Sequence, residues 1–273
     1  MQSIGEIMKF KPAIKGGEII NPYVQTYERM KRAGKVKTAG DTQYTCKKCK
    51  DTGWLTVLEP DGMFSKKPCK CLAKMRVESR LKKSGIIPED YERFSLATFQ
   101  TDTDEHINMK GLAIKYLQTR KPNQGIAYTG SSGTGKTHIC IAICQALTKQ
   151  YGEEHYYFSY RSEIQKIKAA MYDESGQYSR LIQHWTGVNN LYIDDLFKFA
   201  EGRDGKIQPQ DLQIMFDIIN TRYINRKATI FSSEKTISEI TAIDEALGSR
   251  IKSIVGDYGM ACRGDNMRLM KGA

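Results

Sequence analysis

The chain has 273 residues, is 40% hydrophobic, and carries a net charge of +11 from 42 Lys and Arg against 31 Asp and Glu. This length and apolar content predict one large domain with a substantial core and a smaller second domain. The N-terminus lacks the apolar core of a secretory signal and no membrane segment is evident, so we expect a cytoplasmic protein without a membrane partner. The seven cysteines then favour metal binding or packing over disulfides.

The positive charge is concentrated in the N-terminal third. Residues 1–90 contain 19 Lys and Arg against 10 Asp and Glu, whereas the remaining residues contain 23 against 21. Such a region binds nucleic acid, docks an acidic protein or only keeps a surface soluble. Within it, residues 21–34 have the start and stop signals of a helix. Its apolar stripe either docks a partner or packs on its own domain.

Two close pairs of cysteines flank a hairpin-like run that turns at residues 60–62. Four thiolates at this spacing are typical of a structural zinc ribbon, and free cysteines are the alternative. The second pair is CxC rather than CxxC, which tightens that knuckle but still presents two thiolates. A structural role is favoured over a catalytic one, because the segment is poor in apolar residues and contains none of the four histidines. The expected zinc ligands are Cys46, Cys49, Cys69 and Cys71.

Residues 72–86 predict a linking helix that ends before Pro88, and a further helix is expected at residues 104–117. The next segment, GIAYTGSSGTGKT (residues 125–137), predicts a strand, a phosphate-binding loop and a helix. In this pattern backbone N–H groups cradle the phosphates, Lys136 reaches the β- and γ-phosphates, and the Thr137 hydroxyl coordinates Mg²⁺. The apolar strand and helix argue against an ordinary glycine-rich turn. The residues expected to bind ATP are Gly130, Ser131, Ser132, Gly133, Thr134, Gly135, Lys136, Thr137 and His138.

A second strand is expected at residues 155–160 and a helix at 162–171. The third strand, NNLYIDDL (residues 189–196), ends in two carboxylates, as a Walker B motif does. We expect Asp194 to hold Mg²⁺ beside Thr137 and Asp195 to polarise the attacking water. A solvated turn is the alternative for the paired acids.

An amphipathic helix is expected at residues 210–226, a fourth strand at 227–233, and a helix that ends near residues 248–250. Alternating strands and helices predict an α/β fold with a parallel sheet flanked by helices and the nucleotide at the carboxyl ends of the strands. We therefore expect a basic zinc-binding domain at residues 1–90 and a P-loop ATPase domain at residues 91–273.

The loop after the paired acids, FKFAEGRDGK, combines aromatic and basic residues. Stacking and phosphate neutralisation suit single-stranded DNA, and the expected contacts are Lys198, Arg203 and Lys206. The alternative is that Phe197 and Phe199 are core residues and that the charges only solvate the loop.

The order of GSSGTGKT, LYIDDL, INTRYINRKATIFSSE, GSRI and GDNMR resembles the AAA+ ATPases of the DnaC/DnaI helicase-loader type, over residues 94–268. The CxxCxDTGW run at residues 46–54 is similar to the zinc-bearing N-terminal domains of such loaders. This resemblance implies an ATP-dependent loader whose N-terminal domain grips a replicative hexameric helicase of the DnaB type. It also implies that the ATPase domain binds ATP and single-stranded DNA and self-associates.

The resemblance also implies roles for residues outside the phosphate loop: sensor 1 at Ser233, the arginine finger at Arg250 and the sensor 2 arginine at Arg268. Three positions depart from the family pattern. Asp195 stands where many relatives have glutamate, sensor 1 lacks asparagine so that Ser233 or Glu234 must substitute, and Ile254 replaces a second arginine. We therefore expect slow hydrolysis that rises with assembly, because an arginine finger is worth about 10³-fold or more in rate. Arg250 alternatively caps the C-terminal end of its helix.

Two other functions fit the same sequence. An IstB-type transposition accessory ATPase shares the ATPase core, but its relatives usually lack the paired cysteines. A helicase adaptor or inhibitor would use ATP only as a structural switch. A P-loop small-molecule kinase fits poorly, because it gives the cysteine pairs no role.

Overall fold

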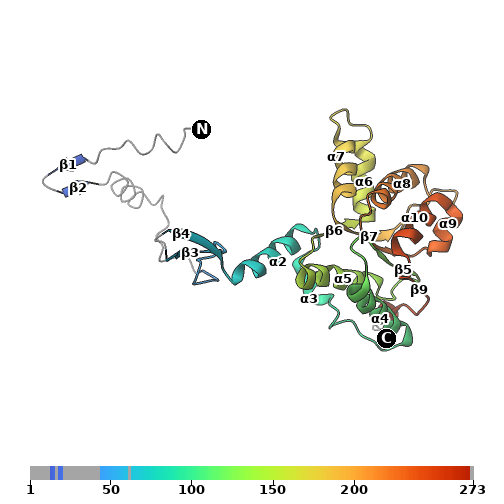
Figure 1. Cartoon of the computed structure of the whole chain (residues 1–273). Coiled ribbons are helices and arrows are strands. Elements are labelled where there is room, and N and C mark those ends of the chain that lie inside the picture. The colour runs from blue at the N-terminus through green and yellow to red at the C-terminus, as the bar shows by residue number, and fades with distance from the viewer. Residues whose placement is uncertain (1–12, 16–17, 21–43, 61–62, 271–273) are drawn as a thin grey trace. The chain divides into compact units, whose positions relative to one another are not determined.

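The computed structural model describes residues 13–15, 18–20, 44–60 and 63–270 (Figure 1). The chain divides into two compact units, residues 1–72 and residues 73–273. The helix expected at residues 21–34 lies outside the described residues. The second unit begins before the boundary expected at residue 90, and the functional assignment of residues 1–90 stays a prediction.

The described part of the first unit consists of two antiparallel pairs of strands. β1 (Ala13–Lys15) pairs with β2 (Glu18–Ile20), and β3 (Trp54–Leu58) pairs with β4 (Phe64–Pro68). The knuckle before β3 is held by the Asp51 carboxylate, which accepts hydrogen bonds from the backbone N–H groups of Thr45 and Cys46 at 3.0 and 2.7 Å. The hairpin therefore begins and ends beside the cysteines, as the sequence predicts.

The second unit is built on a five-stranded parallel sheet with the order β6-β7-β8-β5-β9. Its α/β architecture confirms the predicted fold class. Four of the strands were expected and one, β9, was not. The strands are β5 (Ile126–Gly130), β6 (His155–Ser159), β7 (Asn190–Leu196), β8 (Thr229–Ser233) and β9 (Gly259–Cys262).

Helices cover both faces of this sheet (Figure 1). Strand residues alternate between the faces: Ala127 lies in one apolar cluster, whereas Ile126 and Tyr128 lie in the other. The cluster around Ala127 is completed by side chains of α6 (Tyr160–Ala170), α7 (Gln177–Gly187), α8 (Pro209–Ile224), α9 (Ile237–Ile243) and α10 (Glu245–Val255). The cluster on the opposite face is completed by side chains of α3 (Pro88–Arg93), α4 (Asp104–Thr119) and α5 (Lys136–Tyr151).

The segment that enters the second unit is fastened to the sheet by a chain of buried hydroxyl and imidazole groups. α2 (Cys71–Lys83) is followed by Ser84, whose hydroxyl lies 2.7 Å from that of Tyr91. The Tyr91 hydroxyl lies 2.5 Å from Nε2 of His155, and Nδ1 of His155 lies 2.8 Å from Oγ1 of Thr148. Residues 84–91 are thus part of the packing of the sheet domain.

Among the described residues, no helix combines the length and the apolar character that crossing a bilayer requires.

Candidate nucleotide site and cysteine cluster

The predicted phosphate loop joins β5 to α5 at the carboxyl end of the sheet. Gly130 and Gly133 have φ values of 106° and 80°, where residues with a Cβ are strained. A Cβ on Gly130 would lie 2.1 Å from the carbonyl oxygen of Cys262, and one on Gly133 would lie 2.0 Å from Oδ1 of Asn266. Only glycine fits at these two positions, and the loop leads directly into the N-terminus of α5, which begins at Lys136.

Lys136 is buried in this loop with 6% of its surface exposed. Its Nζ donates to the carbonyl oxygens of Gly130 and Ser131 at 2.9 and 2.5 Å. Desolvation lowers the pKa of Lys136, and the carboxylates of Asp195 and Glu234 partly oppose that shift. A cation is therefore held at the point where a phosphate would enter.

Asp194 is fixed by four hydroxyl groups. Thr137 Oγ1, Tyr192 OH and Ser232 Oγ donate to its Oδ1 at 3.1, 2.5 and 2.5 Å, and Tyr157 OH donates to its Oδ2 at 2.8 Å. Burial raises the pKa of Tyr192 and of Tyr157, and the Asp194 charge adds to both shifts, so both side chains remain O–H donors. The Thr137 hydroxyl and the Asp194 carboxylate are adjacent hard oxygen ligands, which is the donor set that Mg²⁺ prefers.

A cavity of about 550 Å³ opens beside the loop and contains the second acid of the pair. Asp195 lies on its wall, and so do Glu234, one of the two residues offered for sensor 1, and Lys198, which sequence reasoning assigned to DNA. Lys198 Nζ lies 3.0 Å from Asp195 Oδ2 and 2.9 Å from Glu234 Oε1. The wall of this cavity therefore carries three cationic side chains, Arg93, Lys136 and Lys198, and the two carboxylates Asp195 and Glu234.

A second cavity, of about 280 Å³, adjoins the loop and is lined by aromatic rings. The His138 ring lies 5.0 Å from the ring of Phe94 and 5.0 Å from the ring of Phe99, centroid to centroid. His138, Gly133 and Gly135 line both cavities. An aromatic pocket continuous with a phosphate loop is the surrounding that a nucleobase requires. Sequence reasoning missed Phe94 and Phe99, although two phenylalanines just before a P-loop domain were a usable signal.

Ser233 and Glu234 differ in what they contact. Ser233 is buried and donates from Oγ to the carbonyl oxygen of Leu196 at 2.8 Å, so it ties the end of β8 to the end of β7. Glu234 lines the cavity instead. Of the two residues offered for sensor 1, the geometry favours Glu234, and the role itself stays a prediction.

Arg250 lies on α10 and contacts its own domain. Its Nε donates to Asn220 Oδ1 at 2.5 Å, one terminal nitrogen donates to the carbonyl oxygen of Ala246 at 2.8 Å, and the guanidinium lies 4.9 Å from the Phe216 ring centroid. The carbonyl that it binds is one turn before Arg250 and is not the C-terminal end of the helix. Neither cavity of the phosphate loop is lined by Arg250. A finger role therefore requires a second copy of the chain and stays a prediction.

Arg268 belongs to α11 (Met267–Met270), which begins beside the phosphate loop. The backbone N–H of Met267 donates to the carbonyl oxygen of Gly133 at 3.2 Å. The helix that carries Arg268 thus begins at the phosphate loop, and the sensor 2 role of Arg268 stays a prediction.

The loop expected to bind DNA is divided between two environments. Lys198 lies on the nucleotide cavity, whereas Arg203 and Lys206 are exposed. Phe197 is 1% exposed and packs in the core, whereas Phe199 is 70% exposed and lies 5.3 Å below the guanidinium of Arg161. Phe197 is therefore a core residue, as the alternative interpretation has it, whereas DNA stacking by the exposed Phe199 stays a prediction.

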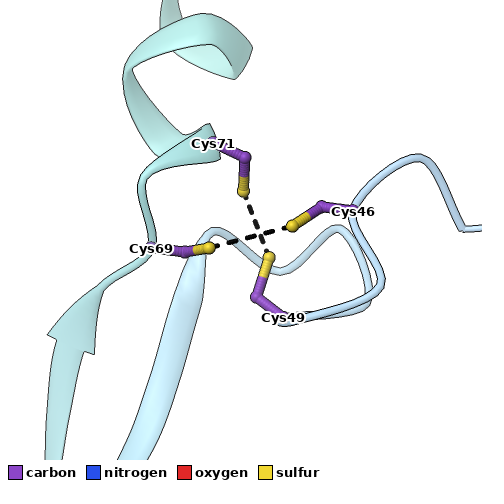
Figure 2. A group of neighbouring side chains, drawn as sticks. All are labelled: Cys46, Cys49, Cys69 and Cys71. Carbon is purple, nitrogen blue, oxygen red and sulfur yellow. Dashed lines mark hydrogen bonds between the residues drawn. The ribbon is translucent and has the colours of Figure 1, made fainter.

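The four predicted zinc ligands come together in the first unit (Figure 2). All four sulfur atoms of Cys46, Cys49, Cys69 and Cys71 lie within 4.8 Å of one another. Tetrahedral zinc with Zn–S bonds of 2.3 Å requires sulfurs about 3.8 Å apart. Cys46 Sγ lies 3.8 Å from Cys69 Sγ, and Cys49 Sγ lies 3.2 Å from Cys71 Sγ, which is closer than that spacing. Backbone N–H groups of Cys49 and Lys48 lower the pKa of Cys46 to about 6, which favours the thiolate there, whereas a hydrogen bond with Cys49 raises the pKa of Cys71. The donor set and its spacing fit zinc.

Comparison with known proteins identifies similar families, sequences and structures. The family described as IstB-like ATP binding protein matches residues 70–253. The Bacillus subtilis protein YqaM, described as uncharacterized, is 32% identical over 81% of this chain and 79% of its own length. The phage-like element PBSX protein XkdC of Bacillus subtilis is 29% identical over 85% of this chain and 87% of its own length. A crystal structure titled as the DnaC helicase loader has a TM-score of 0.54 at 20% identity, covering 63% of this chain and 98% of that one, and shows a shared fold.

Proposed function

We propose that this chain, which belongs to the family of IstB-like ATP binding proteins, is an ATP-dependent helicase loader. It is an ATPase of the loader and IstB type with an AAA+ domain. In the proposal it acts in the cytoplasm, binds a replicative hexameric helicase of the DnaB type and delivers it to single-stranded DNA. The observation that carries the proposal is the presence, in one chain, of this ATPase site and a four-cysteine hairpin with exposed apolar side chains.

The residues of the ATPase site have different roles in the proposed reaction. The loop N–H groups and Lys136 hold the phosphates of ATP, and Thr137 and Asp194 hold Mg²⁺, which offsets phosphate charge when bound. Asp195 polarises the water that attacks the γ-phosphorus. Because its side chain is one methylene shorter than that of glutamate, we expect slow hydrolysis, and Arg250 of a neighbouring copy and Arg268 raise the rate on assembly.

ATP acts as an assembly switch in this proposal. Bound nucleotide orders the phosphate loop and the contact between copies, which favours DNA binding, and hydrolysis releases the loader. Support comes from the loop that follows Asp195. In this loop Lys198 lines the cavity beside the phosphate loop, and Phe199, Arg203 and Lys206 are exposed, where stacking and phosphate neutralisation suit a single strand.

Helicase docking is assigned to the cysteine-bearing unit, with zinc holding its hairpin. Residues paired across β3 and β4 project from the same face, and Trp54, Leu58 and Phe64 on that face are 44%, 61% and 75% exposed. Exposed aromatic and aliphatic side chains grouped in this way mark protein interaction sites. The net positive charge of residues 1–90 complements an acidic partner surface.

The test uses the full chain and the purified replicative helicase of its host. Phe64→Ala and Trp54→Ala should each weaken helicase binding by at least about tenfold, because a central aromatic contact is worth about 2 kcal/mol or more. Ile224→Ala is the matched control, since Ile224 is 66% exposed on the ATPase domain. Binding is measured by interferometry, and loading by ATP-dependent unwinding of a fork with a single-stranded tail.

A second function, an IstB-type accessory ATPase for transposition, is favoured by the family match itself. Wild-type protein that binds duplex DNA or a transposase but no helicase would support this function and sink the loader proposal. Asp195→Ala addresses the adaptor hypothesis: loading that proceeds at the wild-type rate without hydrolysis would show that ATP serves only as a structural switch.

A further inference from the structure

Lys198 lies between the two carboxylates that face the phosphate side of the cavity. Its Nζ is 3.0 Å from Asp195 Oδ2 and 2.9 Å from Glu234 Oε1, and its side chain is 22% exposed. A lysine ammonium has three N–H donors. Two of them serve Asp195 and Glu234, which leaves one N–H for a further acceptor on the cavity side.

The charges of this wall explain why a cation is required there. Asp195 and Glu234 line the same cavity as Lys136 and Thr137, where the terminal phosphate of ATP would enter. Two uncompensated carboxylates would repel a phosphate that carries about two negative charges. Carboxylates also accept but never donate when ionised, so neither can hydrogen-bond a phosphate oxygen directly. The hydrogen bond from Lys198 lowers the pKa of Glu234, so this side chain stays ionised and keeps its lysine partner.

The backbone around Lys198 has an unusual conformation. Asp195, Phe197 and Phe199 have φ values of 55°, 64° and 58°, and the pairing of β7 with β8 is irregular between Ile193 and Leu196. Residues with a Cβ are strained in the left-handed region, and such residues cluster at functional sites. The buried Phe197 ring, 5.7 Å from the ring of Tyr160, anchors the turn that directs Lys198 into the cavity.

We propose that Lys198 binds the γ-phosphate of ATP, and that Glu234 holds Lys198 in position for it. The inference deepens the proposed function, on whose nucleotide site it rests, and it gives Lys198 a task other than DNA binding. The ion pair of Lys198 and Glu234 binds the γ-phosphate as a unit. Glu234 fixes the side chain of Lys198, and Lys198 supplies the positive charge and the N–H donor. The site thereby distinguishes a triphosphate from a diphosphate.

The test compares the affinities of the full protein for a non-hydrolysable ATP analogue and for ADP, both with Mg²⁺, by calorimetry. Lys198→Ala should weaken binding of the analogue by about 10- to 100-fold, the range for a lost hydrogen bond between charged groups, and leave ADP binding within about twofold. Lys198→Arg should restore much of the preference. The matched control is Lys206→Ala, because Lys206 is exposed in the same loop.

A second variant tests the positioning role of Glu234. Glu234→Gln and Lys198→Ala should be strongly non-additive, because each variant disrupts the same ion pair. Single-stranded DNA binding without nucleotide should be unchanged by Lys198→Ala and reduced by Lys206→Ala. If Lys198→Ala weakens ATP and ADP equally, or weakens neither, the γ-phosphate assignment is wrong while the nucleotide site stands. If the wild-type protein binds neither nucleotide, the proposed function fails as well.

Discussion

The two compact units of this protein are stabilised by different means. In residues 73–270 the sheet is enclosed by two apolar clusters, and side chains such as Met109, Ile139 and Leu191 have no exposed surface. In residues 44–60 and 63–72 the buried hydrophobic side chains are Cys49 and Cys69, two of the four clustered thiols. In the described part of the smaller unit a cluster of four thiols stands where a core would be, and we expect bound zinc to stabilise it, whereas the larger unit folds on apolar burial.

The largest expected effect is therefore the loss of order in the first unit on removal of zinc. Structural zinc contributes about 10 kcal/mol or more to folding, and Cys46→Ser or chelation should abolish the ordered hairpin while ATP binding persists. The chain has two tryptophans, Trp54 in the hairpin and Trp185 in the ATPase core, so Trp185→Phe leaves a fluorescence reporter for the first unit alone. Zinc content is measured by atomic emission.

The control for the zinc experiment is Cys144→Ala, which removes a buried thiol of the ATPase core that lies outside the cysteine cluster. It should leave one zinc per chain. A Trp54 signal that is unaffected by complete removal of zinc would contradict the idea that metal replaces a core in this unit.

Arg222 is expected to have the next largest effect, confined to the ATPase unit. It has no exposed surface, and its guanidinium donates to Thr229 Oγ1 and to four backbone carbonyl oxygens, those of Trp185, Val188, Asn189 and Ala228. Arg222→Ala leaves these acceptors unpaired and should lower the free energy of unfolding by about 3–5 kcal/mol. This free energy of unfolding is measured by urea denaturation, followed by Trp185 fluorescence. Arg226→Ala, at an exposed position, should change it by less than about 0.5 kcal/mol.

A smaller, pH-dependent effect is expected from His155 at the junction of residues 84–91 with the sheet. Burial lowers the pKa of His155 to about 4, against about 6.5 in an unfolded chain. The unfolded state therefore gains a proton first, and stability is lost as the pH falls from about 6.5 to about 4, by about 3 kcal/mol in total. Urea denaturation at a series of pH values measures the slope.

His155→Gln should flatten that pH dependence, because glutamine does not titrate in this range. His184→Gln is the control, since the His184 ring packs against Tyr156 and Trp185 at the surface of the cluster. Equal slopes for the wild type and His155→Gln would show that other groups set the acid sensitivity of the ATPase unit.

The parts that the sequence predicts well are those in which neighbouring residues determine the chemistry. The phosphate loop and the pair Asp194 and Asp195 are each specified within a few residues, and the structure brings Thr137 of the loop beside Asp194. The two close pairs of cysteines gather within their own unit. Four of the five strands could be predicted because each is a short apolar run. The short strand β9, with glycine at its start, lacks that signal.

What the sequence did not predict depends on contacts between distant segments. Lys198 could be assigned to DNA because its loop is basic and aromatic, but the left-handed turn at residues 195–199 directs it to the nucleotide cavity. Phe94 and Phe99 reach His138 only because residues 84–99 pack against α5. Such placements follow from the fold and not from local spacing.

The smallest effect that we predict concerns one of the four hydroxyl groups on Asp194. Tyr157→Phe removes the donor to Oδ2 and leaves three donors to Oδ1. Because one hydrogen bond to a charged group is lost beside a cavity that water can enter, stability should fall by only about 1 kcal/mol. The Mg²⁺ concentration for half-maximal ATP hydrolysis should rise, because a hydrogen-bond partner of the metal-binding carboxylate is lost. The control is Tyr156→Phe, one residue away and outside this network, which should change neither the stability nor the Mg²⁺ requirement. Equal changes in both variants would mean that β6 as a whole, and not the hydroxyl of Tyr157, controls Asp194.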